Sequence, residues 1–215
     1  MNKRSSIDIS SKSIKILTVI LLIILFTFVA VFLYADIVTD FESWVYSESV
    51  EHMSPVITAC MKIITHLGDS ITVIILCLVL FTIPYLRKNY ALPISISVTL
   101  ATGINALLKH VFIRPRPDIL RLVSETGYSF PSGHSMISMA LYGAFALLAW
   151  KNMSSIKSKI ITTMVCLALI AMIGFSRIYL GVHYITDVIG GWCLGLAIAL
   201  GVVFGYDKIT TKNED

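Results

Sequence analysis

Charged side chains are scarce in this chain of 215 residues. Asp, Glu, Lys and Arg make up 14% of it, hydrophobic residues make up 56%, and the mean hydropathy is +0.83. A soluble domain of this length has too little interior to hide so much apolar surface. The net charge of +4 is modest and indicates no nucleic-acid partner. Lipid is therefore the expected solvent for most of the chain, and the length suits one membrane domain over residues 1–215.

Cysteines and metal-binding patterns are also few. The four cysteines lie in or beside apolar segments, without the close spacing of metal ligands. We interpret each as a small apolar side chain rather than as a disulfide partner. Carboxylates and histidines form no cluster of the composition that bound metals prefer. The sequence therefore predicts no metal and no other cofactor.

Long uncharged runs are what the chain does contain. The first run, residues 16–35, has 20 residues. At about 1.5 Å per residue such a helix spans a hydrocarbon core of about 30 Å. A signal peptide has a shorter apolar part, about 7–15 residues, so we expect a retained helix. The whole pattern predicts an all-α, polytopic membrane protein. Its six expected transmembrane helices cover residues 16–35, 57–85, 89–108, 133–150, 160–175 and 188–206.

Residues 36–60 separate the first two expected spans. They carry five acidic side chains, and apolar residues recur at helical spacing from Ile37 to Val45. This pattern predicts a short extracytoplasmic amphipathic helix that lies at the membrane interface. Two roles stay open for it: a plain connector with an aromatic anchor, or a gate for substrate entry.

Three smaller features receive structural interpretations. In the outer third of the second span, His66 and Asp69 are left outside the site, because a lone histidine there is typical of a hydrogen-bonded packing residue. Residues 84–90 are expected to form a tight basic turn. The last span has small-xxx-small glycine pairs, at 191/195 and 201/205, which close helix packing explains.

The positions of the basic residues predict the orientation. Six spans place both termini on one side, and eleven of the 17 Lys and Arg fall on that side. By the positive-inside rule that side is cytoplasmic. The sequence thus predicts a multi-pass plasma-membrane protein with cytoplasmic termini. Most of the remaining basic residues lie in three polar segments on the extracytoplasmic side.

The segment at 176–187 places three ionisable residues among apolar ones. His183 and Asp187 are four residues apart, so on a helix they share a face and the carboxylate can reach one imidazole nitrogen. The other nitrogen is then available for attack. Arg177 offers the planar donors that suit phosphate oxygens. The alternative is a purely structural ion pair, in which the two groups pair only to reduce the free-energy cost of placing them in the membrane.

A second segment, at 109–117, follows the third span. Lys109 sits at a helix end and Arg116 in a turn stiffened by two prolines, so both can point at one anion. The alternative is a basic patch that touches lipid headgroups.

The third segment, at 131–134, opens the fourth span. Proline, Ser132 and Gly133 at a helix start leave amide groups aimed outward, which is a favourable anion site. His134 lies beside it and can donate a proton. A simple capped helix start is the alternative. All three segments are expected at outer membrane ends, where they can converge at one depth.

Together the three segments resemble the signature of the phosphatidic acid phosphatase type 2 superfamily. Lys-x6-Arg-Pro, Pro-Ser-Gly-His and Ser-Arg-x5-His-x3-Asp occur complete and in order within residues 109–187. The six-span layout is similar to the membrane branch, and the chain resembles small bacterial lipid phosphatases of the phosphatidylglycerophosphatase B type. Residues 36–60 are too short for the larger soluble insert of some members.

The resemblance implies a metal-free phosphatase mechanism. His183 would be the nucleophile that forms a phosphohistidine, and Asp187 would orient it. His134 would protonate the leaving group and then activate water. The phosphate would be held by Lys109, Arg116, Ser132, the Gly133 amide and Arg177.

The substrate stays open at this point. A site at the outer interface suits an amphiphile such as phosphatidylglycerophosphate, phosphatidate, diacylglycerol pyrophosphate or undecaprenyl pyrophosphate. Membrane lipids are the other expected partners, and the oligomeric state is left undecided. The alternative function is an anion-binding transporter or channel without hydrolase activity.

Overall fold

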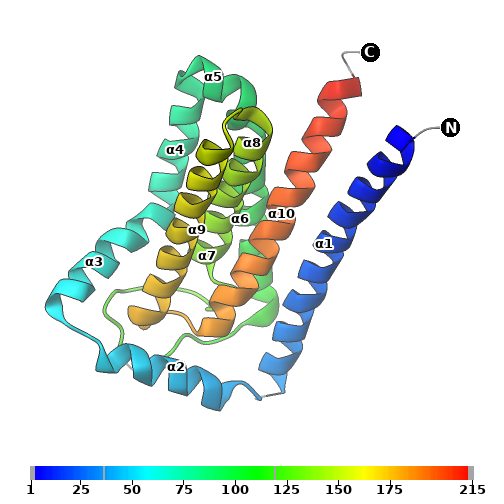
Figure 1. Ribbon diagram of the computed structural model, residues 1–215. Helices are drawn as coiled ribbons and strands as arrows, with labels where there is room; N and C mark the ends of the chain where they lie inside the picture. Colours follow the sequence, from blue (N-terminus) through cyan, green and yellow to red (C-terminus); the bar gives the residue numbers. More distant parts are fainter. Residues whose placement is uncertain (1–2, 36, 119, 213–215) are drawn as a thin grey trace.

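The structure is a computed structural model that describes residues 3–35, 37–118 and 120–212. Its described part is built of helices without strands, which confirms the expected all-α class. Three short non-α turns interrupt them: His66–Gly68 is 3-10 helical, and Arg87–Ala91 and Met139–Gly143 are π-helical. The α-helices are α1 (Lys3–Tyr34), α2 (Thr39–Glu51), α3 (Pro55–Thr65), α4 (Ser70–Thr82), α5 (Pro84–Leu86), α6 (Leu92–Phe112), α7 (Gly133–Ser138), α8 (Ala144–Asn152), α9 (Ile156–Tyr179) and α10 (Ile185–Lys212) (Figure 1).

Among the described residues, five helical stretches are long and apolar enough to cross a membrane, and a bent pair makes a sixth if it counts as one span. The bent pair corrects the expectation of one continuous second span. Here α3 and α4 meet at 52°. Gly68 weakens the helix, and Asp69 is extended, with φ −69° and ψ 146°. Its carboxylate does not cap α4 but bonds to two histidines instead, so the break serves other contacts.

The expected tight turn at residues 84–90 is wrong. Pro84 starts a helical stretch that continues to Phe112, and the chain turns at Ile83 instead. Proline is favoured in the first turn of a helix, where no N–H is needed, and it disfavours helical backbone at the residue before it. Ile83 is accordingly extended, with φ −94° and ψ 115°.

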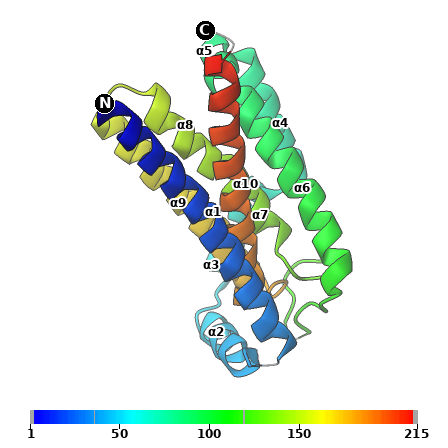
Figure 2. The same cartoon turned by 90° about the vertical axis from the view of Figure 1, so that its right-hand side faces the viewer.

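The bundle has two distinct ends. The termini, α5 and the α8–α9 connection lie together at one end, shown at the top of Figure 1. The amphipathic helix α2, the loop between α6 and α7, and the α9–α10 connection lie at the opposite end (Figures 1 and 2). The three signature segments therefore share one end, away from the basic connections. The assignment of these ends to the two sides of the membrane stays a prediction.

The helix α10 packs against α1, α6 and α7. A Cβ atom at Gly191 would lie 2.8 Å from the Ser132 carbonyl oxygen, and one at Gly195 would lie 2.4 Å from the Met136 carbonyl oxygen. Close packing of α7 on α10 therefore explains this glycine pair. At Gly201 and Gly205 an added Cβ would meet no described atom within 4 Å, so packing within the chain does not explain the second pair.

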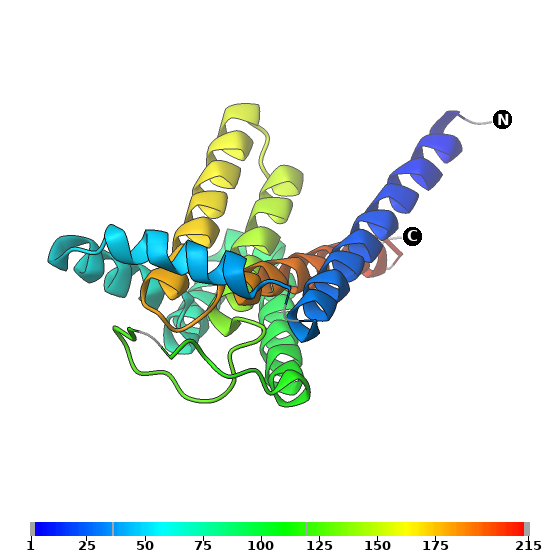
Figure 3. The ribbon, with the colours of Figure 1, turned by 90° about the horizontal axis from the view of Figure 1, so that it is seen from below.

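The expected amphipathic helix is α2, and it crosses the end of the bundle (Figure 3). Its buried residues include Glu42 and Tyr46, while Phe41 and Trp44 are 49% and 58% exposed. Tyr46 Oη donates to the Leu120 carbonyl at 2.9 Å, which ties the helix to the loop after α6. The side of α2 with Glu42, Tyr46 and Ser49 thus meets protein, and the side with Phe41 and Trp44 points outward, as suits an interfacial helix.

Candidate active site

His183 and Asp187 lie at the start of α10. His183 precedes the helix in the α9–α10 connection and Asp187 is in its first turn, so the prediction that both share a helical face is wrong. The contact itself forms: His183 Nδ1 lies 3.2 Å from Asp187 Oδ2. The Tyr184 amide also donates to that oxygen, at 2.9 Å. A tight connection, rather than helical spacing, brings the pair together.

The hydrogen bonds define the tautomer of His183. Arg116 Nη1 lies 3.1 Å from His183 Nε2, and because a guanidinium only donates, Nε2 must accept. Nδ1 therefore carries the proton and donates to Asp187. Burial lowers the pKa of His183 to about 3, although Asp187 opposes this shift. The imidazole is thus neutral near pH 7, with its lone pair on Nε2.

The connection before His183 depends on Gly181. Its φ of +69° is in the left-handed region, and a Cβ atom there would lie 2.0 Å from the Leu120 carbonyl oxygen. The loop after α6 crosses the connection at this point, where the Leu122 amide donates to the Leu180 carbonyl at 3.0 Å. Only glycine fits both the conformation and the contact.

Gly181→Ala is therefore expected to destabilise the protein by roughly 3 kcal/mol, from the left-handed backbone and the overlap together. It should also disturb the site, because the loop can no longer lie against the segment that carries His183. Thermal unfolding in detergent measures the first effect. Gly201→Ala is the matched control, since an added Cβ has open space there. Equal melting temperatures for the two variants would contradict the expectation.

Two buried arginines flank His183. Arg116 also donates to the Val182 carbonyl from Nη1 and to the Gly127 carbonyl from Nε, both at 3.0 Å. Arg177 is 1% exposed and donates from Nη1 to Thr65 Oγ1 at 2.5 Å, while its Nη2 pairs with Glu125. Arg177 Nε is buried without an acceptor among the described residues. An oxygen of a bound anion would satisfy this donor.

The segment that opens α7 lies against the same site. The Ser132 amide donates to the Asp187 carbonyl oxygen at 3.0 Å, which joins two signature segments directly. Asn105 Nδ2 donates to the Pro131 carbonyl at 3.0 Å, and a Cβ at Gly133 would lie 3.1 Å from Asn105 Oδ1. The fully buried Ser132 accepts a hydrogen bond from Ser135 Oγ at 3.0 Å. The backbone of residues 131–133 is therefore held by α6 on one side and by α10 on the other.

His134 brings in a carboxylate that the sequence analysis left outside the site. Its Nε2 lies 2.6 Å from Asp69 Oδ1, across 65 positions of the chain. Asp69 Oδ2 lies 2.5 Å from His66 Nδ1. No spacing links Asp69 to the signature segments, and only the break between α3 and α4 brings it there. His66 and Asp69 are thus not merely packing residues of a continuous span.

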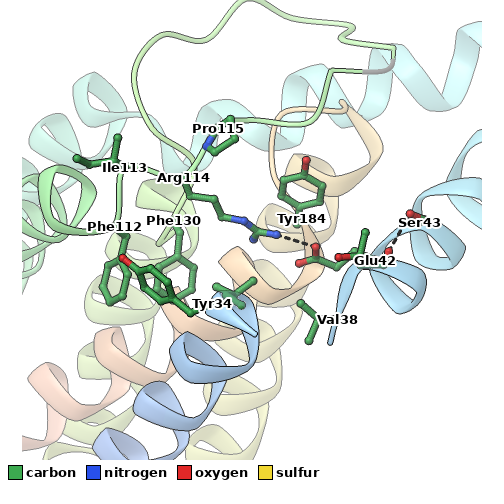
Figure 4. A pocket seen from close by; sticks show the side chains of 12 residues that line it. Tyr34, Val38, Glu42, Ser43, Phe112, Ile113, Arg114, Pro115, Phe130 and Tyr184 are labelled. Atoms are coloured by element: carbon green, nitrogen blue, oxygen red, sulfur yellow. Dashed lines mark hydrogen bonds and ion pairs between the residues drawn. The ribbon is translucent and has the colours of Figure 1, made fainter. Parts of the chain in front are cut away.

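A second unpredicted group lies behind Asp187. Arg114 donates from Nη1 to Asp187 Oδ1 at 2.5 Å. It also donates from Nη2 to Glu42 Oε2 at 2.6 Å (Figure 4). Thr186 hydroxyl also donates to Glu42. Burial raises the pKa of Glu42 above its usual value. Burial would lower the pKa of Arg114, but the carboxylates of Asp187 and Glu42 raise it. The interfacial helix α2 is thereby tied to the His183–Asp187 pair.

A cavity of about 430 Å³ lies beside this group, between the end of α1, α2 and the end of α6 (Figure 4). Its wall is largely aromatic and aliphatic, and Arg114 and Glu42 supply the charged part. Tyr184 covers the Arg114 guanidinium at 4.0 Å from its ring centroid. Asp187 does not line the cavity, but it accepts a hydrogen bond from Arg114, which does.

Lys109 and Glu125 complete the set. Lys109 is in the last turn of α6, and its charge interacts with those of Arg116 and Arg177. Burial would raise the pKa of Glu125, but its ion pair with Arg177 lowers it, so Glu125 is ionised. The structure thus brings the predicted residues to one end of the bundle. It adds three carboxylates that the sequence analysis missed: Glu42, Asp69 and Glu125.

A bundle of apolar helices with buried histidine–carboxylate pairs and guanidinium groups at one end suits a membrane-embedded phosphatase. A family model of the PAP2 superfamily matches residues 90–210, and the chain belongs to this family. One relative matches it over most of its length.

Phosphatidylglycerophosphatase B of Bacillus subtilis is 31% identical over 193 residues, which cover 87% of this chain and 93% of that protein. An undecaprenyl-diphosphatase of Sulfolobus acidocaldarius is 33% identical over 114 residues, 50% of this chain and 51% of that protein. The crystal structure of a transmembrane PAP2-type phosphatidylglycerolphosphate phosphatase of Bacillus subtilis matches with a TM-score of 0.80 at 31% identity, over 89% of this chain and 96% of that one. The expected fold and family are confirmed.

Proposed function

We propose that the chain hydrolyses the phosphate headgroup of a membrane lipid through a phosphohistidine on His183. The observation that carries the proposal is the hydrogen bonding of the His183 imidazole. Its Nδ1 contacts Asp187, and its unprotonated Nε2 accepts from Arg116. Asp187 fixes the direction of this neutral imidazole, and its Nε2 lone pair can attack once the Arg116 guanidinium donates to the phosphate instead. Membership of a phosphatase family favours this function over the alternative of an anion transporter.

In the first step His183 Nε2 attacks phosphorus, and the bond from phosphorus to the leaving oxygen breaks. His134 gives its proton to that oxygen, and the Asp187 carboxylate stabilises the positive charge of the phosphorylated imidazole. In the second step neutral His134 takes a proton from water, whose oxygen attacks phosphorus. The N–P bond breaks, phosphate leaves, and His183 is neutral again.

In the proposed mechanism, the cationic groups around His183 bind the phosphate. Arg116 is within hydrogen-bonding distance of the nucleophile, and the unpartnered Nε of Arg177 points to an anion as its acceptor. Lys109, Ser132 and the Gly133 amide complete the proposed set. Preorganised positive charge of this kind stabilises the charge that develops on the phosphoryl oxygens.

The substrate class follows from the position of the site. It lies at the end of the bundle that carries α2, where a phosphate at headgroup level can reach it, and we assign this end to the extracytoplasmic side. Phosphatidylglycerophosphate, phosphatidate, diacylglycerol pyrophosphate and undecaprenyl pyrophosphate all fit. Similarity to phosphatidylglycerophosphatase B over 87% of the chain favours the first. Comparing kcat/KM for these four lipids in detergent tests the proposal, and release of phosphate from none of them would contradict it.

We expect hydrolysis to be independent of a divalent metal. Activity in excess EDTA should stay within about twofold of the untreated value, because guanidinium and ammonium groups supply the positive charge that a metal would otherwise supply. Among the described residues no three His, Cys, Asp or Glu side chains form a group suited to a metal. EDTA saturated with Mg²⁺ is the control. A loss of activity on chelation that a divalent ion restores would overturn this expectation.

A further inference from the structure

We propose that Asp69 is a positioning residue for His134, and that residues 65–69 are a fourth part of the site beside the three signature segments. Asp69 Oδ1 lies 2.6 Å from His134 Nε2, and Asp69 Oδ2 lies 2.5 Å from His66 Nδ1. The same segment supplies Thr65, which accepts a hydrogen bond from Arg177. The proposal rests on the hydrolytic function above and adds to it how the acid–base histidine is held.

The backbone of this segment is shaped to approach His134. A Cβ atom at Gly68 would lie 3.2 Å from His134 Cδ2 and 2.8 Å from Ile173 Cγ2, so only glycine permits the distance. Tyr142 Oη donates to the Leu67 carbonyl at 3.1 Å and holds the 3-10 turn against the same span as His134. In a continuous helix, the backbone at position 69 would be helical and the Asp69 side chain would be rotated around the helix axis. The 52° break instead leaves its carboxylate on His134.

The hydrogen bond assigns a role to each nitrogen of His134. An ionised carboxylate only accepts hydrogen bonds, so His134 Nε2 carries a hydrogen and donates a hydrogen bond to Asp69. The proton that moves in the reaction is then the one on Nδ1. It goes to the leaving oxygen in the first step, and a proton from water replaces it in the second. His183 is the converse case, because its Nδ1–H donates to Asp187 and its Nε2 reacts.

The charges that face His134 come from three elements. Asp69 comes from the α3–α4 break, Arg177 from α9, and Glu125 from the loop after α6. Arg177 and Glu125 are paired with each other, so their effects on an imidazolium at His134 largely offset. Asp69 is then the charge that stabilises the protonated form of His134, which the first step requires.

The experiment compares the wild type with Asp69→Asn on two substrates, with enzyme in excess so that only one turnover is seen. Phosphatidate has a poor leaving group that needs a proton, and p-nitrophenyl phosphate has a leaving group that departs without one. Asp69→Asn keeps the size of the side chain and a hydrogen-bond acceptor but removes the charge. We expect cleavage of phosphatidate to slow by about 30-fold and release of nitrophenolate to slow by less than about threefold.

Controls separate this role from a structural one. Asp40→Asn makes the same change at an exposed position of α2 and should leave both rates unchanged. Asp69→Glu restores the charge and should recover part of the rate with phosphatidate. Equal losses on the two substrates, or weaker binding of substrate with an unchanged single-turnover rate at saturating enzyme, would overturn the role of Asp69. A wild-type protein that cleaves neither substrate would instead overturn the proposed function.

A double-mutant cycle gives a second, independent reading. If Asp69 acts only through His134, then adding Asp69→Asn to His134→Ala should change the rate with phosphatidate by less than about twofold. The thermal transition of each protein in detergent shows that all four members of the cycle are folded. A further loss of 10-fold or more in the His134→Ala background would mean that Asp69 acts elsewhere, and the proposal would fall.

Discussion

Replacing His183 by alanine is expected to lower the rate of phosphate release from a lipid phosphate by roughly 10³- to 10⁶-fold, the range seen when a covalent nucleophile is removed. In the proposed mechanism, His183 Nε2 is the protein atom that forms a bond to phosphorus. The cationic groups around it bind and polarise the phosphate but cannot replace it. KM should change much less than kcat, since the arginines that hold the phosphate remain.

Two measurements distinguish loss of the nucleophile from loss of the fold. Wild-type protein quenched in base during turnover should carry acid-labile, base-stable phosphate, as a phosphohistidine does, and the variant should carry none. His110→Ala is the matched control, because His110 is an exposed histidine at the same end of α6 and outside the proposed site. Unchanged turnover by the His183→Ala protein would remove the catalytic hypothesis altogether.

The sequence allowed the three signature segments to be placed at one end of the bundle, because each lies at the end of an apolar run. The structure joins them through contacts such as Ser132 N to the Asp187 carbonyl oxygen. The geometry of His183 was not predictable from spacing. Residues four apart suggested a helical face, whereas the left-handed Gly181 and a short connection produce the contact instead.

The carboxylates that accompany the site were beyond prediction for a different reason. Asp69 reaches His134 across 65 positions, and Glu42 reaches Arg114 across 72. Ion pairs of this kind depend on how distant helices pack, and nothing in the local sequence of α2 or of the α3–α4 break distinguishes these acids from exposed ones. The break between α3 and α4 was equally hard to predict, because a glycine within an apolar run is compatible with a continuous span.

The second large effect is expected at Arg114. Arg114→Met keeps an unbranched apolar stem but removes the only described cation bonded to Asp187 and Glu42, which are 0% and 6% exposed. Breaking one side of a buried ion pair costs about 3–5 kcal/mol, since the partner is left as an uncompensated charge. We expect a fall of this size in stability and a loss of at least about 100-fold in kcat, because Asp187 no longer holds His183 in a fixed orientation.

The pH dependence of the defect distinguishes this explanation from simple loss of packing. Burial already raises the pKa of Glu42 above its usual value while Arg114 opposes the shift, so removing Arg114 must raise it further. A carboxyl whose pKa is higher in the folded than in the unfolded protein costs stability as pH rises through the folded value. The melting temperature of Arg114→Met should therefore fall further below the wild type at pH 8 than at pH 5.

Adding Glu42→Gln to Arg114→Met should remove most of this pH dependence and recover part of the melting temperature, because it removes one of the two uncompensated buried charges. It should recover little activity, since Asp187 still lacks Arg114. Arg87→Met is the matched control, an exposed arginine at the opposite end of the bundle. A defect in Arg114→Met that is the same at both pH values, or that Glu42→Gln worsens, would show that α2 and the His183–Asp187 pair are not coupled through the charge of Arg114.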